Sequence, residues 1–183
     1  MKIASWDLGR SLGGCYGVAG KVPVSGTFVL RKPGEDNGVA LGTLARFLRD
    51  HVRANGKDDL WVVEHWLPPK QQKSAANVED SLRMNGVVNG IAGVYGIEVV
   101  EPYPATVRSQ VCGAPSAPGE SERGGRMMKN TKWLVIDTMI MRGLLPKGCD
   151  QDDRADACAG WVWAEANFAR TAPANFQLTG GKP

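Results

Sequence analysis

The sequence predicts an α/β domain whose mixed five-stranded sheet, an antiparallel meander followed by parallel strands, carries helices on both faces. Three short strand-like segments come first, with no helical segment between them, which favours a meander. Two segments follow, each next to a helical pattern: the almost wholly apolar residues 60–64 and residues 97–101. We expect both to be buried strands, as is typical of parallel strands. A meander that passes into strand–helix alternation builds a single mixed sheet.

The first part of the chain supplies the meander. Residues 2–8 are predicted as a strand that carries Asp7 at its end, and Gly9–Gly14 as a tight turn because glycine recurs in it. Residues 15–20 and 24–31 are predicted as the second and third strands.

The middle of the chain alternates helix and strand. Apolar residues three and four positions apart predict a helix over 39–54, and Asn55-Gly56 ends it. Residues 60–64 are predicted as a buried strand and the Pro-rich segment 67–77 as a loop. A glycine-containing helix is predicted over 78–96.

The last part is predicted to be mostly helical. An acid at position 150 or 152 is expected to cap the final helix. The predicted elements are a strand over 97–101, a short helix over 105–111, a mobile loop over 112–125, a helix over 126–143, and a helix from Asp152 to about Arg170. Residues 1–170 thus form one domain, and we expect residues 171–183 to be a flexible C-terminal tail.

Composition narrows the class of protein. The 22 Lys and Arg residues against 19 Asp and Glu give a net charge of +3, which permits a nucleic-acid partner without requiring one. No segment approaches the roughly 18 apolar residues of a membrane span, and Asp7 interrupts what would be the core of a signal peptide. We therefore expect a cytoplasmic protein. The four cysteines lack C-x-x-C spacing, which argues against a zinc site or a disulfide framework.

Four acids stand where a sheet could bring them together. Asp7 ends the first strand, Glu64 ends the buried strand at 60–64, and Asp153 and Asp156 lie at i and i+3 near the start of the last helix. If these two strands are neighbours, their acids meet at the edge where open α/β sheets bind ligands.

Such a cluster predicts a metal site. Carboxylates in one place repel one another unless cations neutralise them, and Mg²⁺ prefers carboxylate oxygens. Two ions about 4 Å apart can promote phosphodiester cleavage. The residue pattern alone leaves other interpretations open, because acids are common in turns and at helix N-termini, where they compensate the helix dipole.

Three motifs, in order, carry a family resemblance. Asp7 lies in the first motif, W-D-L-G-R-S-L-G-G-C-Y-G-V. Glu64 ends the second motif, V-V-E, and Asp153 and Asp156 belong to the third, Q-D-D-R-A-D-A. Together they resemble the RuvC-type Holliday-junction resolvases of the ribonuclease H-like nuclease superfamily, up to about residue 170. The resemblance implies a ribonuclease H-like fold in which these four acids are catalytic and bind metal. Asp152 breaks the D-x-x-D-A spacing and fits the motif less well.

The resemblance also implies a catalytic lysine one helix before the last acids. Lys132 fits its position best, and Lys129 is the neighbour that could replace it. Such a lysine could stabilise charge that develops on the phosphate. The stretch V-V-E-P-Y-P-A-T-V-R-S-Q-V-C-G resembles the family's strand, short helix and loop, and it places Arg108 where a DNA-contacting base is expected.

The activity implied is that of a crossover junction endodeoxyribonuclease, which resolves four-way DNA junctions by paired symmetric nicks. Two Mg²⁺ or Mn²⁺ ions per site would support cleavage that leaves a 5′-phosphate. Paired nicks need two sites, so a two-fold homodimer is expected. The helix over 78–96 is the candidate interface; packing of its glycines against the sheet is the alternative.

Basic side chains outside the acid cluster are expected to contact DNA phosphates. They are Lys70, Lys73, Arg83, Arg108, Arg123, Arg126 and Lys129. Trp66, or an aromatic residue near it, could stack on an unpaired base, although packing is the alternative for each tryptophan.

Two departures from the family pattern leave alternatives open. The turn after Asp7 is one residue longer, and the loop after Glu64 is more aromatic and richer in proline, which fits a bacteriophage-encoded variant. The alternatives are a broader nuclease for branched or flap DNA, a non-catalytic junction-binding protein, and an RNA-strand hydrolase. These differ in which nucleic acids they cleave, if any.

Overall fold

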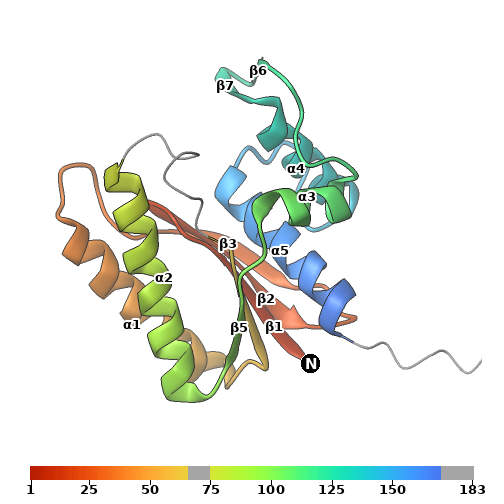
Figure 1. Ribbon diagram of the computed structural model, residues 1–183. Helices are drawn as coiled ribbons and strands as arrows, with labels where there is room; N and C mark the ends of the chain where they lie inside the picture. Colours follow the sequence, from red (N-terminus) through yellow and green to blue (C-terminus); the bar gives the residue numbers. More distant parts are fainter. Residues whose placement is uncertain (66–74, 170–183) are drawn as a thin grey trace, which may run out of the picture.

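The computed structural model describes residues 1–65 and 75–169, and it contains the predicted mixed sheet (Figure 1). The strands lie in the order β3-β2-β1-β4-β5. They are β1 (Lys2–Asp7), β2 (Ser11–Val18), β3 (Val24–Val29), β4 (Leu60–Val63) and β5 (Glu98–Val100). The first three pair in antiparallel fashion, whereas β4 and β5 run parallel to β1. The predicted meander followed by parallel strands is therefore confirmed.

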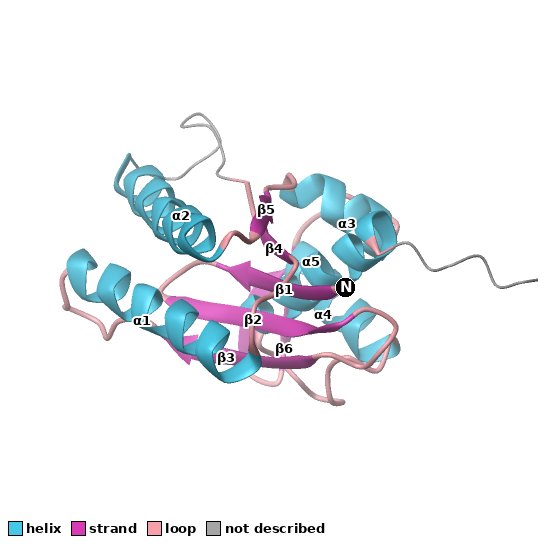
Figure 2. Cartoon of the chain, turned by 90° about the horizontal axis from the view of Figure 1, so that it is seen from below, coloured by secondary structure: helices cyan, strands magenta, loops and turns pink. Residues whose placement is uncertain are grey.

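Helices cover both faces of this sheet, as the sequence predicts (Figure 2). On one face lie α1 (Asn37–Asn55) and α2 (Ala75–Tyr95). On the other lie α3 (Pro104–Cys112), α4 (Asn130–Met141) and α5 (Asp152–Phe168). Among the described residues, no helix is long and apolar enough to cross a membrane.

The parallel pairing of β1 with β4 decides where the functional residues lie. Trp6 of β1 stands opposite Val63 of β4 in the register. Asp7 and Glu64, one residue further along each strand, therefore emerge side by side at the same edge of the sheet. The adjacency that the sequence analysis required is confirmed.

Aromatic side chains fill the core between the sheet and α1. Trp6 packs edge to face against Trp61, with ring centroids 5.9 Å apart. His51 joins them and shares a buried hydrogen bond of 2.8 Å with Asp58, whose Oδ2 also accepts from the Trp61 indole at 2.8 Å. One carboxylate thus satisfies two buried polar groups.

Asp58→Ala should therefore lower the free energy of unfolding by about 2–4 kcal/mol, because it leaves two buried nitrogens without their acceptor. Urea denaturation followed by tryptophan fluorescence measures this. Asp59→Ala, one residue away, removes only an exposed acceptor of the Lys2 N–H and should cost less than about 1 kcal/mol. Equal losses in the two variants would contradict the role given to Asp58.

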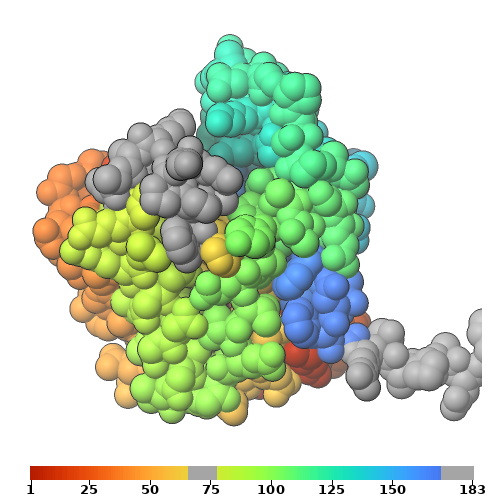
Figure 3. Space-filling view, viewed as in Figure 1, coloured from red at the N-terminus to blue at the C-terminus, as the bar shows by residue number. Residues whose placement is uncertain are grey.

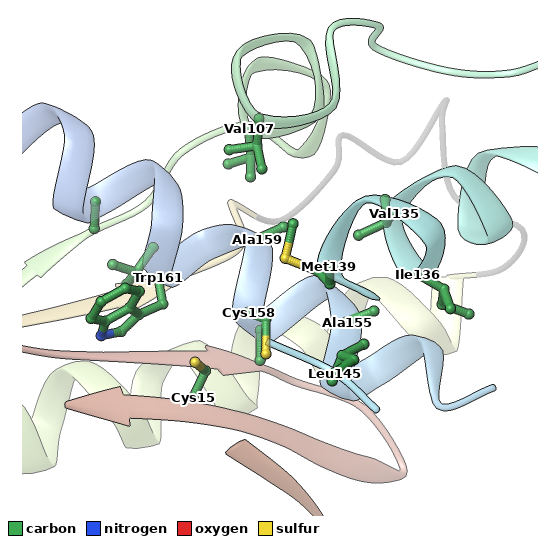
Figure 4. Close-up of a cluster of buried hydrophobic side chains, with 14 of the residues drawn as sticks. Cys15, Val107, Val135, Ile136, Met139, Leu145, Ala155, Cys158, Ala159 and Trp161 are labelled. Carbon is green, nitrogen blue, oxygen red and sulfur yellow. The ribbon is translucent and has the colours of Figure 1, made fainter. Parts of the chain in front are cut away.

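The opposite core depends on small residues that let α5 lie close to the sheet. Ala155, Cys158 and Ala159 of α5 are buried there (Figure 4). Glycine is needed at Gly13 in β2, because a Cβ atom there would lie 1.9 Å from the Asp153 carbonyl oxygen. The N-terminal turn of α5 is thereby held directly against β2.

Several predicted boundaries are wrong. β2 begins at Ser11, so most of the segment Gly9–Gly14 is strand; glycine occurs there for close packing and not for a turn. The predicted loop over 112–125 and the start of the helix over 126–143 contain a β-hairpin instead. It consists of β6 (Glu120–Arg123) and β7 (Arg126–Lys129), joined by Gly124 and Gly125 at φ values of 60° and 80°.

The cap of the last helix is also corrected. The N-cap residue of α5 is Gln151, with no side-chain cap, and not Asp150 or Asp152. The side chain of Asp152 is engaged elsewhere, as described below. The tail over 171–183 and the loop residues Trp66, Lys70 and Lys73 lie outside the described residues.

Candidate active site

A pocket of about 700 Å³ lies at the carboxyl edge of β1 and β4. Its wall brings together all five side chains that the sequence analysis assigns to catalysis. They are Asp7, Glu64, Lys132, Asp153 and Asp156.

Each acid is placed by a different part of the fold. Asp7 is the last residue of β1, and Glu64 directly follows β4. Asp153 and Asp156 lie in the first turns of α5, which Gly13 allows to approach the sheet. Two strands and one helix thus deliver four carboxylates to one pocket.

The electrostatics of the pocket reflect this crowding. Burial and the charge of Asp156 raise the pKa of Asp7 well above its usual range. Burial raises the pKa of Glu64 to about 7, with the charge of Asp156 adding to the effect. Burial also raises the pKa of Asp156 to about 6, although Arg108 and Lys132 oppose the rise. Burial and the charge of Asp152 raise the pKa of Asp153 as well.

The donor set has the chemistry of a divalent-cation site. Oxygen ligands on carboxylates suit Mg²⁺ or Mn²⁺. The raised pKa values reflect burial first and repulsion between the acids second, and a bound cation would favour the charged carboxylates against both. Within the described part of the chain, no three or more potential ligands are already grouped to hold an ion. The four carboxylates nonetheless line one pocket.

Lys132 and Lys129 both lie on the pocket wall, so the structure retains both candidates for the catalytic lysine. Lys132 donates a hydrogen bond to Asp152. That bond and the charge of Asp152 outweigh the effect of burial and raise the pKa of Lys132 above its usual range. The lysine is therefore a fixed positive charge beside the acids.

The other predicted DNA-contacting residues are dispersed. Arg108 of α3 lines the pocket, and its Nε donates to the Pro115 carbonyl at 2.9 Å. Arg83 pairs with Glu79 on the exposed surface of α2. The hairpin residues Arg123 and Arg126 are tied to acids by hydrogen bonds of 2.7 Å.

Sequence reasoning missed two features at the pocket rim. The exposed Tyr103 lines the pocket and stacks on His65, with ring centroids 4.4 Å apart. Its position between two prolines shortly after β5 was the available signal. The double pairing of Asp152 was also missed, because nothing in the local sequence brings residues 126 and 132 beside it.

Comparison with known proteins shows what the chain resembles in three dimensions. No family model matches it, and no curated protein matches it by sequence. Thermus thermophilus RuvC is similar in structure, with a TM-score of 0.65 and 23% identity over 93% of this chain and 96% of that protein.

Two further solved structures are similar. Thermus thermophilus RuvC in complex with a Holliday junction substrate has a TM-score of 0.63 and 18% identity over 94% of this chain and 96% of that one. The yeast mitochondrial Holliday junction resolvase Ydc2 has a TM-score of 0.56 and 10% identity over 90% of this chain and 78% of that one. The chain therefore has the ribonuclease H-like fold of these resolvases, as the sequence analysis predicts.

Proposed function

We propose that this protein is a metal-dependent endonuclease that resolves four-way DNA junctions by paired symmetric nicks. The observation that carries the proposal is the meeting of four acids and a lysine in one pocket, at the carboxyl edge of a fold shared with Holliday junction resolvases. The neighbour bound to a Holliday junction supports branched DNA as the substrate.

The four acids would hold two Mg²⁺ or Mn²⁺ ions. When bound, such ions supply an activated water for in-line attack on phosphorus and stabilise the leaving 3′ oxygen, so that the product carries a 5′-phosphate. Lys132 would neutralise charge on the phosphate oxygens in the transition state. Arg108, which also lines the pocket, would fix the DNA backbone without reading sequence.

Paired nicks require a second copy of the site, for which we propose a two-fold homodimer. The exposed face of α2 supports the placement of its interface there. Gly86, Gly90 and Gly93 lie on that face, and a Cβ atom at any of them would meet no neighbouring atom within 4 Å. These glycines are therefore open to a partner helix and do not pack against the sheet.

A substrate panel tests the proposed function. Four-way, three-way and flap DNA, linear duplex and an RNA–DNA hybrid are incubated separately with Mg²⁺ and with Mn²⁺. We expect the four-way junction to be cut at least tenfold faster than linear duplex. A tenfold ratio of rates corresponds to a difference of about 1.4 kcal/mol in activation free energy. Equal cutting of flaps would indicate a general debranching nuclease, and preference for the hybrid an RNA-strand hydrolase. Binding without nicks in either metal would indicate a junction-binding protein.

Stability should depend on pH and metal through the same acids. Glu64 has a raised pKa in the folded protein, so the fold binds protons more strongly than the unfolded chain does between about pH 4 and 7. Its contribution to stability is therefore present at low pH and is lost as the pH rises through about 7.

Glu64→Gln removes this titration and serves as the matched variant. In EDTA the two proteins should have similar Tm values near pH 5, and the variant should be more stable at pH 8 by about 2–4 °C. Mn²⁺ at pH 8 should raise the Tm of the wild-type protein more than that of the variant. Thermal scans would contradict the account if Mn²⁺ left the wild-type Tm unchanged.

A further inference from the structure

Three elements meet on one carboxylate beside the pocket. Asp152 is the first residue of α5, and its side chain is 9% exposed. Its Oδ1 accepts a hydrogen bond of 2.7 Å from Arg126 of β7. Its Oδ2 accepts one from the Lys132 ammonium of α4. The two oxygens are thus divided between a hairpin arginine and the candidate catalytic lysine.

The partners of Asp152 distinguish it from the four acids of the pocket. Each of its carboxylate oxygens already accepts a hydrogen bond from a cationic side chain, Oδ1 from Arg126 and Oδ2 from Lys132. Asp7, Glu64, Asp153 and Asp156 line the pocket, whereas Asp152 is not among its lining residues. Two cationic side chains already neutralise Asp152, so it does not need a metal ion for that purpose.

Arg126 connects this carboxylate to the hairpin of β6 and β7. The hairpin protrudes beside α3 and α4 at the top of the molecule (Figures 1 and 3). Both of its arginines anchor it to the body, and the Ser121 carbonyl also accepts a hydrogen bond from the Trp133 indole. Arg123 binds Asp137 of α4 and lies over the Trp133 ring, 4.9 Å from its centroid. Arg126 reaches Asp152 and also donates to the Asp150 carbonyl.

Lys132 needs such a partner to act at a defined place. A lysine side chain is a point charge on a flexible stem that can adopt many rotamers. This one is 44% exposed along its side chain, so packing alone does not fix it. Asp152 is buried in the first turn of α5 and precedes the pocket acid Asp153, which places a fixed acceptor at the pocket rim.

We propose that Asp152 is a positioning residue that holds the Lys132 ammonium at the rim of the acid pocket, and that Arg126 fixes the Asp152 carboxylate for this role. The Arg126 anchor of the hairpin and the placement of the lysine thus depend on the same carboxylate. This inference rests on the proposed nuclease function, and it assigns Asp152 to the lysine and not to a metal ion.

A double-mutant cycle on single-turnover nicking of a four-way junction tests it. Asp152→Asn should slow nicking about 10- to 100-fold at saturating Mn²⁺. Lys132→Ala should slow it by at least as much. The double variant should be no more than about twofold slower than Lys132→Ala, because both changes remove the same function, the placed ammonium group. Multiplied losses would mean independent roles and would overturn the proposal.

The hairpin is tested in the same cycle. Arg126→Ala should slow nicking about 3- to 10-fold in the wild-type background and have no effect in the Asp152→Asn background. Asp137→Asn is the matched control, since it frees the other hairpin arginine without contacting Lys132, and it should leave the rate unchanged. A loss in Asp137→Asn equal to that in Arg126→Ala would show that hairpin anchoring in general is responsible.

Two further measurements separate positioning from other roles. Asp152→Asn should keep the wild-type rise in Tm with Mn²⁺ and the wild-type affinity for junction DNA in Ca²⁺; loss of the Mn²⁺ effect would make Asp152 a metal ligand. Asp152→Glu keeps the charge and should nick faster than Asp152→Asn; an equal rate would overturn the role of the charge. Absence of nicking by the wild-type protein would instead refute the proposed function.

Discussion

Asp7→Asn is expected to slow nicking of a four-way junction by at least about a thousandfold. The change keeps the size of the side chain and removes one negative charge from the centre of the pocket. Asp7 is buried close to the charges of Asp156, Glu64 and Asp153, so its carboxylate would hold cations together with theirs. Loss of a single electrostatic contact aimed at the transition state costs about 10²- to 10³-fold in rate, and here cation binding is impaired as well.

The measurement is the single-turnover rate on labelled junction DNA with saturating Mn²⁺, with binding measured separately in Ca²⁺. Affinity should stay within about threefold, because phosphate contacts come from basic residues. Glu98→Gln is the control: Glu98 is an exposed acid at the start of β5, away from the carboxyl edge. An Asp7→Asn protein with a tenth or more of the wild-type rate would contradict the assigned site.

Gly13→Ala is expected to damage stability and activity together. The added Cβ would lie 1.9 Å from the carbonyl oxygen of Asp153 and 2.4 Å from its carbonyl carbon. Both neighbours are backbone, so no side-chain rotation can relieve the contact, and α5 must move away from β2. We expect a loss of about 3 kcal/mol in the free energy of unfolding and a Tm lower by about 6–12 °C.

The movement would also carry Asp153 away from the pocket. A misplacement of about 1 Å at a catalytic group can cost 10²-fold in rate, so nicking should fall by about that factor at temperatures where the variant is folded. Gly26→Ala is the matched control, since Gly26 lies in neighbouring β3 and its added Cβ would meet nothing within 4 Å. A Gly13→Ala protein with wild-type Tm and rate would show that α5 does not approach β2 as described.

The sequence was most informative where a residue's role depends on its own strand. Two strand-like segments that each end in an acid predicted that Asp7 and Glu64 meet if the strands are neighbours, because parallel strands end at the same edge of a sheet. The i, i+3 spacing likewise placed Asp153 and Asp156 together on α5. Both predictions use only the periodicity of a strand or helix and the order of the elements along the chain.

The errors arise where tertiary contacts override local preference. Gly13 resembles a turn residue in the sequence, but it lies within β2. Glycine is required there because α5 passes too close to leave room for a Cβ atom. The hairpin strands E-S-E-R and R-M-M-K lack a regular apolar alternation, so only the Gly124-Gly125 turn could have indicated them. Asp152 resembles a helix cap, whereas its two partners come from elements distant in the chain.

The most direct test of the central claim is to map the nicks on a four-way junction labelled on each strand in turn, in Mg²⁺ and in Mn²⁺. The account predicts one nick in each of two opposed strands at symmetry-related positions, with 5′-phosphate ends that a ligase can seal. Cuts at unrelated positions, or no cuts in either metal while the junction is bound, would contradict the claim that this acid pocket resolves junctions.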